Sequence, residues 1–251
     1  MDLTENFGFN LSEKLNNLEI SSEQILLAYL KRISEINSTI NAIISLEETE
    51  KLLINSRKID QLRQKGEPIH PCAGLPIAIK DLENTRGLLT TQGSQIYSDY
   101  VPKTDSPMVA NIRKAGLVII GKTNTPEFGV GGQTFNSLFE TTVNPFDLKL
   151  TAGGSSGGAA AAVRSRLVPF ADGSDMMGSL RTPSSFCRTY GFRPTPGVIP
   201  SIPNYREDLP QISTNGVIAR HPIDLAILLE ILSGRTKNFL ATRTSNPQIL
   251  K

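Results

Sequence analysis

The sequence predicts an α/β fold in which a β-sheet is covered by helices on both faces. Three short apolar runs have the length and composition of buried strands: Leu75 to Ile79, Leu117 to Ile120 and Leu167 to Ala171. Segments with helical periodicity precede, separate and follow these runs. Strands that are apolar along their whole length are buried on both faces of a sheet. Strands that alternate with helices are typical of α/β domains, so the two observations predict the same fold class.

The composition is that of a globular protein, with 251 residues of which 39% are hydrophobic and 20% charged. The net charge of +2 gives no reason to expect nucleic acid or an anionic membrane as a partner. No apolar run is long enough to span a bilayer, and the N-terminus lacks the features of a secretory signal. The two cysteines, Cys72 and Cys187, are too few for a disulfide framework. We therefore expect a cytoplasmic protein with no nucleic-acid and no membrane partner.

The first part of the chain predicts two helices. Ser21 and Gln24 have the spacing of a capping box, and apolar residues recur at helical spacing from there to Ile36. A second helix is expected from Glu47 to about Arg63, where glycine follows. Neither helix carries visible chemistry, so both are interpreted as packing elements.

Four further helices are predicted between and after the apolar runs. Their expected bounds are Met108 to Ala115, Ala159 to Arg164, Thr182 to Tyr190, and Pro222 to Leu232. From Arg193 to Pro210 five prolines interrupt any regular pattern, which predicts an irregular loop suited to the rim of a pocket.

Residues Gly116 to Thr123 match the P-loop pattern G-x-x-x-x-G-K-[ST]. In a P-loop a strand precedes the first glycine and a helix follows the lysine. Here the expected strand lies between the two glycines, and Pro126 follows the lysine closely where a P-loop would have a helix. Residues Gly121 to Pro126 are predicted to form a loop. The match is interpreted as coincidental, and no nucleotide or other cofactor is expected.

The chemistry centres on Thr151 to Arg181, which contains two glycine–serine clusters at residues 153–158 and 173–179. Paired glycines permit positive φ angles and close approach of other atoms. A hydroxyl in such a loop, among inward-facing amide groups, can act as a nucleophile opposite an anion hole. The alternative is a flexible Gly/Ser linker. The runs AAAAV and LVPFA between the clusters argue against that alternative.

At these residues the chain resembles the amidase signature family. The similarity rests on GGSSGG, on DMMGSLR with 24 residues (179 − 155) between the two serines, and on GLPIAIKD. The last segment places a lysine at Lys80, 75 residues (155 − 80) before Ser155. Members of this family hydrolyse amides with a Ser–Ser–Lys triad. The resemblance covers roughly residues 20 to 232.

The resemblance implies one domain with a mixed sheet of more strands than this chain supplies. On this interpretation residues 1–251 are the N-terminal part of a single amidase domain, and the fold is incomplete at the C-terminus. Within it, residues 1–66 form a helical packing segment, 67–234 the catalytic core and 235–251 a loose tail. An incomplete sheet leaves an open edge, so association between copies of the chain is expected.

The resemblance also assigns the catalytic roles. Ser179 attacks the amide carbonyl and carries the acyl group, Ser155 relays the proton, and Lys80 is the final base. In the family the peptide bond at the bridging serine is cis.

The residues themselves support a lysine as the base. A serine hydroxyl needs a group that takes its proton. The only histidines, His70 and His221, each stand beside proline and away from the nucleophile motif, so both are interpreted as structural. A lysine can replace histidine if burial lowers its pKa to about 7–8. Lys80 at the end of an apolar strand is the first candidate, and Lys122 is the second.

Backbone N–H groups of Met176, Met177, Gly178 and Ser179 are expected from the resemblance to form the oxyanion hole. Many family members have glycine where this chain has Met177, so its side chain should reshape the acyl pocket. Ser156, the neighbour of the bridging serine, is expected to be a helix N-cap rather than a relay.

Three functions fit these features. The first is a general amidase that hydrolyses a small carboxamide to an acid and ammonia or an amine. The second is the amidase subunit of the tRNA-dependent amidotransferase, which releases ammonia from glutamine and requires partner subunits. The third is a truncated, non-catalytic remnant. The first is our main interpretation, with a small-molecule amide as substrate and no metal.

Overall fold

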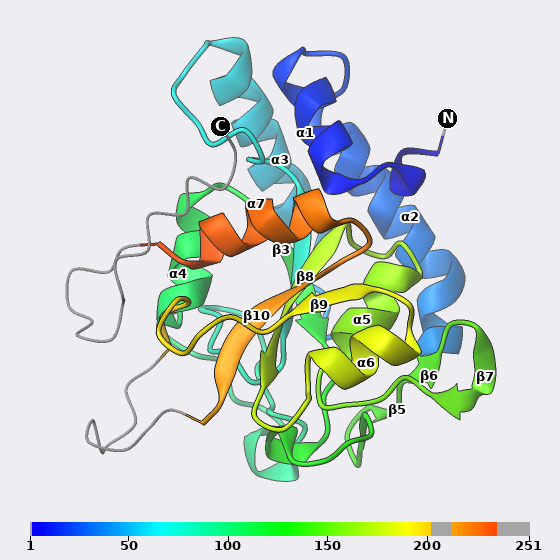
Figure 1. The fold of residues 1–251 in the computed structure, drawn as a ribbon. Coiled ribbons are helices and arrows are strands. Elements are labelled where there is room, and N and C mark those ends of the chain that lie inside the picture. The colour runs from blue at the N-terminus through cyan, green and yellow to red at the C-terminus, as the bar shows by residue number, and fades with distance from the viewer. Residues whose placement is uncertain (1, 202–211, 235–251) are drawn as a thin grey trace.

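The computed structural model describes residues 2–201 and 212–234. Within these residues the largest sheet has six strands in the order β1-β3-β2-β8-β10-β9 (Figure 1). The three strands β3, β2 and β8 run parallel to one another, and the outer pairings are antiparallel. The predicted mixed α/β sheet is therefore confirmed. The strand bounds are β1 Ile43–Ile44, β2 Pro76–Lys80, β3 Val118–Thr123, β8 Phe170–Asp175, β9 Tyr190–Phe192 and β10 Thr214–Ala219.

Helices cover both faces of this sheet because its strands are apolar on both sides. Alternate residues of β2 enter different apolar clusters: Ile77 and Ile79 pack in one, and Ala78 packs in the other. The first cluster contains residues of α1, α4 and α7, the second contains residues of α3 and α5, and α2 contributes to both. The helix bounds are α1 Gly8–Asn16, α2 Ser22–Ile40, α3 Thr49–Gln64, α4 Pro107–Lys114, α5 Gly157–Arg164, α6 Arg181–Phe186 and α7 Pro222–Leu232.

The helix ends follow the local signals in the sequence. Ser21 Oγ accepts from the Gln24 N–H at 3.0 Å and Gln24 Oε1 accepts from the Ser21 N–H at 2.9 Å, which is the expected capping box of α2. At α7 the Nδ1 atom of His221 accepts from the Ile223 N–H at 3.2 Å, and Pro222 takes the first helical position. His221 thus has the structural role that the sequence predicts.

Two strands extend further than predicted, because pairing with neighbours overrides the polar and glycine-rich sequence at their ends. β3 continues to Thr123, so Lys122 lies in a strand opposite Ile44 and Ile79 and not in a loop. β8 begins at Phe170 and runs to Asp175, beyond the predicted end at Ala171, because its last residues pair with β10.

The predicted helix from Thr182 to Tyr190 is wrong in extent. α6 ends at Phe186, and Arg188 adopts the left-handed conformation with φ of 50°. The chain then reverses, and Tyr190–Phe192 forms the edge strand β9 against β10. A left-handed residue after a helix is a common C-terminal signal, but it is hard to recognise when the residue is arginine.

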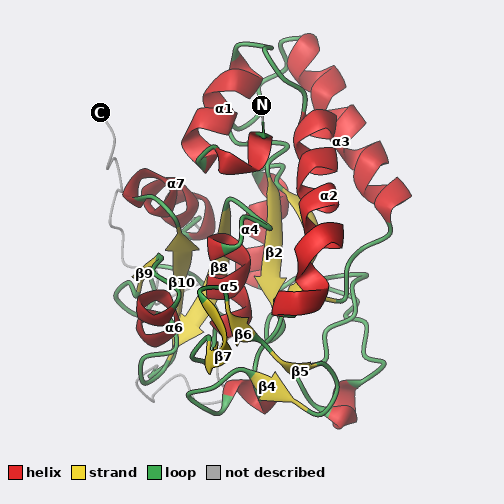
Figure 2. Ribbon diagram, turned by 90° about the vertical axis from the view of Figure 1, so that its right-hand side faces the viewer, coloured by secondary structure: helices red, strands yellow, loops and turns green. Residues whose placement is uncertain are grey.

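Several short elements were not predicted. In the part of the chain that the structure describes there are two small hairpins, of which β4–β5 lies beyond the C-terminal end of β2 (Figure 2). Their bounds are β4 Phe135–Asn136, β5 Glu140–Thr141, β6 Val143–Asn144 and β7 Asp147–Thr151, and the short 3₁₀ helices are η1 Leu3–Glu5, η2 Gln95–Tyr97 and η3 Glu127–Gly129.

Parts of two predictions lie outside the described residues, namely the second half of the proline-rich loop and the tail at 235–251. Residues 193–201 of that loop contain no helix or strand. Among the helices that the structure describes, none combines the length and apolar character needed to cross a bilayer.

Candidate active site

Lys80 is the last residue of β2 and is 1% exposed. Its strand lies between β3 and β8, and its backbone N–H donates to Asp172 Oδ1 at 2.9 Å, which joins β2 to β8 at this level. Burial disfavours the charged form of an amine and lowers the pKa of Lys80 to about 7, with nearby carboxylates opposing the shift. A large fraction of Lys80 is therefore neutral near neutral pH.

Three serine hydroxyls surround the amine of Lys80. Its Nζ lies 2.8 Å from Ser155 Oγ, 2.9 Å from Ser156 Oγ and 2.9 Å from Ser174 Oγ. As an ammonium, Lys80 donates to all three oxygens. As a neutral amine, its lone pair can accept a proton from one of them. The arrangement can therefore move a proton between a serine and the lysine.

The loop that holds Ser155 is fixed by close packing against another segment. The Gly154–Ser155 peptide bond is cis. Thr125 Oγ1 donates to the Ser155 carbonyl at 3.1 Å. A Cβ atom at Gly154 would lie 2.7 Å from the backbone nitrogen of Gln133, so only glycine fits here. The structure thus brings Lys80 and Ser155 together as the sequence predicts.

The side chain of Ser156 does not cap α5 as expected, and the sequence motifs did not identify Ser174 as a neighbour of Lys80. Ser156 takes the N-cap position of α5 but makes no side-chain capping bond. Its hydroxyl contacts Lys80 instead and donates to the Ser174 carbonyl at 3.2 Å. Ser174 lies near the end of β8, which runs parallel to β2. Carboxyl ends of parallel strands meet at one edge of a sheet, so a correct end for β8 would have placed Ser174 near Lys80.

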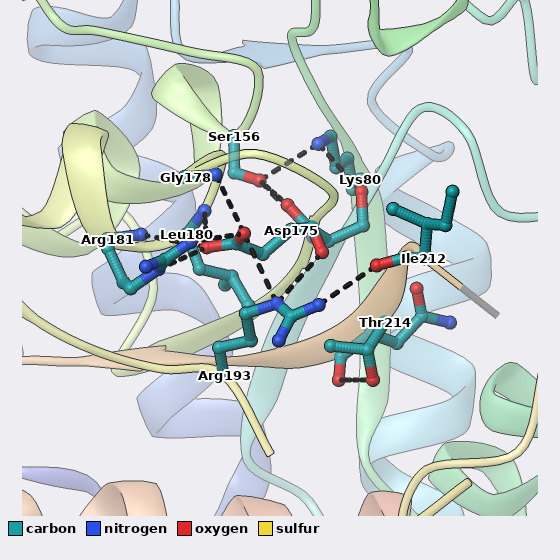
Figure 3. A network of polar contacts seen from close by, with 11 residues as sticks. Lys80, Ser156, Asp175, Gly178, Leu180, Arg181, Arg193, Ile212 and Thr214 are labelled. Carbon is teal, nitrogen blue, oxygen red and sulfur yellow. Dashed lines mark hydrogen bonds and ion pairs between the residues drawn. The ribbon is translucent and has the colours of Figure 1, made fainter. Parts of the chain in front are cut away.

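Residues 175–181 carry the predicted nucleophile, Ser179, and are called the nucleophile loop for that reason. This loop folds around the carboxylate of Asp175 (Figure 3). Asp175 accepts from the backbone N–H of Gly178 at 2.8 Å and of Leu180 at 3.1 Å. Both Nε and Nη2 of Arg181 also donate to it at 3.0 Å. Burial alone raises the pKa of Asp175, but the Arg181 side chain and these amides outweigh it and hold the pKa at about 2. Asp175 is therefore an ionised organiser of the loop.

Arg193 supports the same carboxylate from the far side of the loop (Figure 3). Its Nε lies 3.3 Å from Asp175 Oδ1 and donates to the Asp175 carbonyl at 3.2 Å, while its Nη2 donates to the Ile212 carbonyl at 2.9 Å. The segment after β9 and the start of β10 are thereby tied to the nucleophile loop.

Ser179 lies next to the lysine–serine cluster through a backbone contact. Its carbonyl accepts from the Ser156 N–H at 3.2 Å, and the residue is half-buried. In the described part of the chain, no hydrogen bond joins Ser179 Oγ to Ser155 Oγ. The link between these two hydroxyls remains a prediction.

The expected oxyanion hole also remains a prediction, and the structure reduces the number of backbone amides that could serve as its donors. The Gly178 N–H already donates to Asp175, and the φ of +121° at Gly178 suits only glycine. Met177 is 88% exposed and is not among the residues with positive φ, so methionine is tolerated where many family members have glycine. The amides of Met176, Met177 and Ser179 are the remaining candidate donors.

The other candidate bases have different surroundings. Lys122 Nζ donates to the Glu83 carbonyl at 2.5 Å and to the hydroxyls of Thr85 and Thr90 at 3.0 and 3.2 Å. His70 Nδ1 accepts from the Cys72 N–H at 3.1 Å, which is a local turn contact. Within residues 2–201 and 212–234, no cluster of three His, Cys, Asp or Glu side chains could hold a metal ion.

Residues 24–248 of the sequence match the family model described as Amidase. The chain belongs to the amidase family. Solved structures agree with this assignment. A bacterial aryl acylamidase of the amidase signature family is 28% identical, with a TM-score of 0.89 over 95% of this chain and 49% of its own. The peptide amidase from Stenotrophomonas maltophilia is 29% identical, with a TM-score of 0.86 over 96% of this chain and 50% of its own.

Curated relatives in the amidase family carry a different name. The A subunit of the glutamyl-tRNA(Gln) amidotransferase of Natranaerobius thermophilus is 39% identical over 93% of this chain and 47% of its own length. The protein of the same name from Thermus thermophilus is 41% identical over 86% of this chain and 44% of its own length. This chain thus spans about half the length of the curated relatives that it matches.

Proposed function

We propose that this amidase-family chain carries an amide-hydrolysing relay in which Ser179 is the nucleophile, Ser155 the bridge and Lys80 the base. The observation that supports it is the buried amine of Lys80, 2.8 Å from Ser155 Oγ, with a pKa lowered to about 7. A lysine in water is almost fully protonated at neutral pH and cannot accept a proton. Burial in a cluster of hydroxyls removes that obstacle.

The proposed chemistry has two balanced steps. In the first, Ser179 Oγ bonds to the amide carbon, its proton passes to Ser155 and the Ser155 proton passes to Lys80. The C–N bond then breaks, and the same path returns a proton to the leaving nitrogen as ammonia or an amine. In the second, water attacks the acyl ester, the relay takes the water's proton, and the acid leaves as the proton returns to Ser179.

The oxyanion of each tetrahedral intermediate would be bound by backbone N–H groups of the nucleophile loop. Met176, Met177 and Ser179 are the donors that we propose, because the Gly178 N–H is held by Asp175. Removal of one donor of this kind in other enzymes costs about 10²–10³ in rate. Backbone donors cannot be removed by changing side chains. A substitution of Asp175, whose carboxylate holds the loop in place, is the way to disturb them.

We further propose that the whole protein acts as the amidase component of a glutamyl-tRNA(Gln) amidotransferase, with glutamine as the source of ammonia. The two relatives of that name above are 39% and 41% identical, whereas the two amidases of solved structure are 28% and 29% identical. Under this proposal partner subunits and a tRNA-linked substrate belong to the whole protein. The sequence-based expectation of no nucleic-acid partner has no support from these names.

A free-standing amidase is the second candidate, and the nucleophile loop favours it. Met177 stands where the amidotransferase component is expected to be strict about glycine, and its exposed side chain would narrow the space beside Ser179. In either case we propose a single domain in which residues 67–234 contain the catalytic groups.

A fluorophosphonate probe tests the relay without knowledge of the substrate. The full chain should be labelled at Ser179, and both Ser179→Ala and Lys80→Ala should abolish labelling. Labelling that persists in Ser179→Ala contradicts the assigned nucleophile, and a folded chain with no labelling at all favours the non-catalytic remnant. Ammonia release from glutamine, compared with release from acetamide and a peptide amide, then separates the two candidate functions.

A further inference from the structure

A cavity of about 490 Å³ lies among α2, the connection from α5 to β8, the turn of the β6–β7 hairpin and the end of β10. The hairpin lies beside the C-terminal half of α2 in both ribbon views (Figures 1 and 2). Ser155 and Ser156 precede the first residue of α5, whereas the cavity is at its last residue. The cavity is therefore separate from the candidate active site.

Four arginines line this cavity and no acidic residue does: Arg32, Arg164, Arg166 and Arg220. One of the four charges is balanced, because Arg166 Nη1 pairs with Glu5 Oε1 at 2.7 Å, but Glu5 itself is largely exposed. Asp2 is a second, more distant partner of Arg166, at 3.9 Å. Among the described residues the cavity wall thus carries an excess of positive charge.

Arg220, which follows the last residue of β10, is partly buried. Its Nη2 donates to the carbonyls of Thr4 and Asn6 at 3.0 and 2.7 Å, which satisfies donors without neutralising the charge. Its Nε is buried and has no hydrogen-bond partner. Burial lowers the pKa of Arg220, and the charges of Arg166 and Arg164 lower it further, whereas Tyr29 and the carboxylate of Asp224 oppose the shift. The like charges therefore lie close enough to repel one another.

The other two arginines are held in place by neutral contacts. Arg32 Nε donates to the Ser165 carbonyl at 3.3 Å, and the guanidinium of Arg164 lies 4.3 Å from the centre of the Phe146 ring. Neither contact supplies a negative charge. Positioned guanidinium groups lose little side-chain entropy when an anion binds, which favours affinity.

We propose that this cavity is a binding site for a compact phosphate-bearing small molecule, with a diphosphate as the minimal ligand. Guanidinium groups bind phosphate oxygens through paired N–H donors, and several of them suit more than one phosphate. The volume is within the range of small-molecule sites, and Ile36, Ile40 and Pro145 provide an apolar wall for the rest of the molecule. An RNA backbone would require an extended basic track, whereas these charges surround one hollow.

Calorimetric titration of the full chain with inorganic pyrophosphate at low ionic strength tests the proposal. Saturable one-to-one binding is expected, and it should weaken as salt rises. Arg164→Gln and Arg32→Gln should each weaken binding about ten-fold, because each removes charge-assisted hydrogen bonds. Arg57→Gln is the matched control, because Arg57 is an exposed arginine of α3 that pairs with Glu23 outside the cavity, and its binding should equal that of the parent.

Further ligands and variants decide the outcomes. Arg164→Lys keeps the charge and loses the paired donors, so it should bind pyrophosphate more weakly than the parent even if Arg164→Gln fails to fold. ATP that binds more tightly than pyrophosphate would identify a nucleotide source, and ATP that fails to bind would identify free diphosphate. Four results would each overturn the proposal. Two concern pyrophosphate itself: binding that Arg57→Gln weakens equally, or no saturation at millimolar concentration. The other two are citrate that binds as tightly as pyrophosphate, and RNA that binds when pyrophosphate does not.

Discussion

Two buried lysines on adjacent strands of the sheet, Lys80 and Lys122, have different partners around their amines. Lys80 ends β2 and Lys122 lies in β3, where it is paired in register with Ile79. The amine of Lys80 contacts three serine hydroxyls. The amine of Lys122 contacts a carbonyl and two threonine hydroxyls and has the carboxylate of Asp81 at 3.9 Å.

The difference bears on which of the two buried lysines is better suited to the proposed role of base. Burial lowers the pKa of both side chains, and Asp81 is the main group that opposes this for Lys122. Asp81 follows Lys80 directly in the chain, yet its carboxylate is bound by the N–H and hydroxyl of Thr91 and faces the other lysine. The pKa of Lys80, whose amine contacts only hydroxyls, is lowered to about 7, and the pKa of Lys122, which has Asp81 at 3.9 Å, is lowered to about 8. At neutral pH Lys80 is therefore the more readily deprotonated of the two.

The largest expected effect is on catalysis at Lys80. Lys80→Met should lower the rate of amide hydrolysis by at least about 10³-fold, because among the described residues Lys80 is the only base within hydrogen-bonding distance of Ser155 Oγ. It should not lower stability, since burying an amine among hydroxyls is itself unfavourable. Initial rates measure the effect on hydrolysis, and urea unfolding measures the effect on stability. A Lys80→Met protein with more than a tenth of the parent activity would contradict the comparison.

Lys122→Met should act on stability instead. It leaves Asp81 buried without its cation, which typically costs about 3–5 kcal/mol. The double variant Lys122→Met/Asp81→Asn should recover part of this loss, because the uncompensated charge is gone. Urea unfolding of the parent, the single and the double variants measures both effects. If the two lysine variants lost the same stability, the environments would not differ as described.

The pH dependence of activity sharpens the comparison further. In the proposed relay the neutral form of Lys80 is the active form, so activity should rise about ten-fold per pH unit below about 7 and level off above it. The folded protein also binds fewer protons at Lys80 than the unfolded chain does between pH 7 and 10.5, so this group makes the unfolding free energy increase with pH over that range. Rates and unfolding measured from pH 5 to 10, with Lys80→Met as the control, test both.

The smallest expected effect is at Ser174. Ser174→Ala removes one of the three oxygens that accept from the ammonium of Lys80 and so destabilises the charged form. The midpoint of the pH–activity curve should move to lower pH, while the maximal rate falls less than ten-fold. Ser155→Ala should remove most of the activity by comparison. An unchanged midpoint in Ser174→Ala would show that this hydroxyl does not tune the lysine.

The sequence was sufficient to predict those helices and site residues that a local motif or an apolar period marks. α2 and α7 follow from their caps and apolar spacing, and α7 has the predicted bounds. Lys80 and Ser155 were found through motifs far apart in the chain, because the resemblance connects segments that no local rule connects. Their contact at 2.8 Å is where that expectation and the structure agree.

The remainder depends on contacts between distant segments. β9 exists because β10 offers it an edge, and nothing in Tyr190–Phe192 predicts that partner. Ser174 could not be assigned until the end of β8 was known, since one strand residue more or less changes the face of the sheet. The two-residue strands of the small hairpins are too short to give a period at all.

Because three hydroxyls surround the amine of Lys80, few atoms need to move when the amine gains or loses a proton. An ammonium has three N–H donors and finds three oxygens, so every hydroxyl can turn its own hydrogen elsewhere. When the lysine loses its proton, one hydroxyl need only rotate about its C–O bond to point its hydrogen at the amine. The heavy atoms can stay where they are, and the reorganisation energy of the proton transfer is correspondingly small.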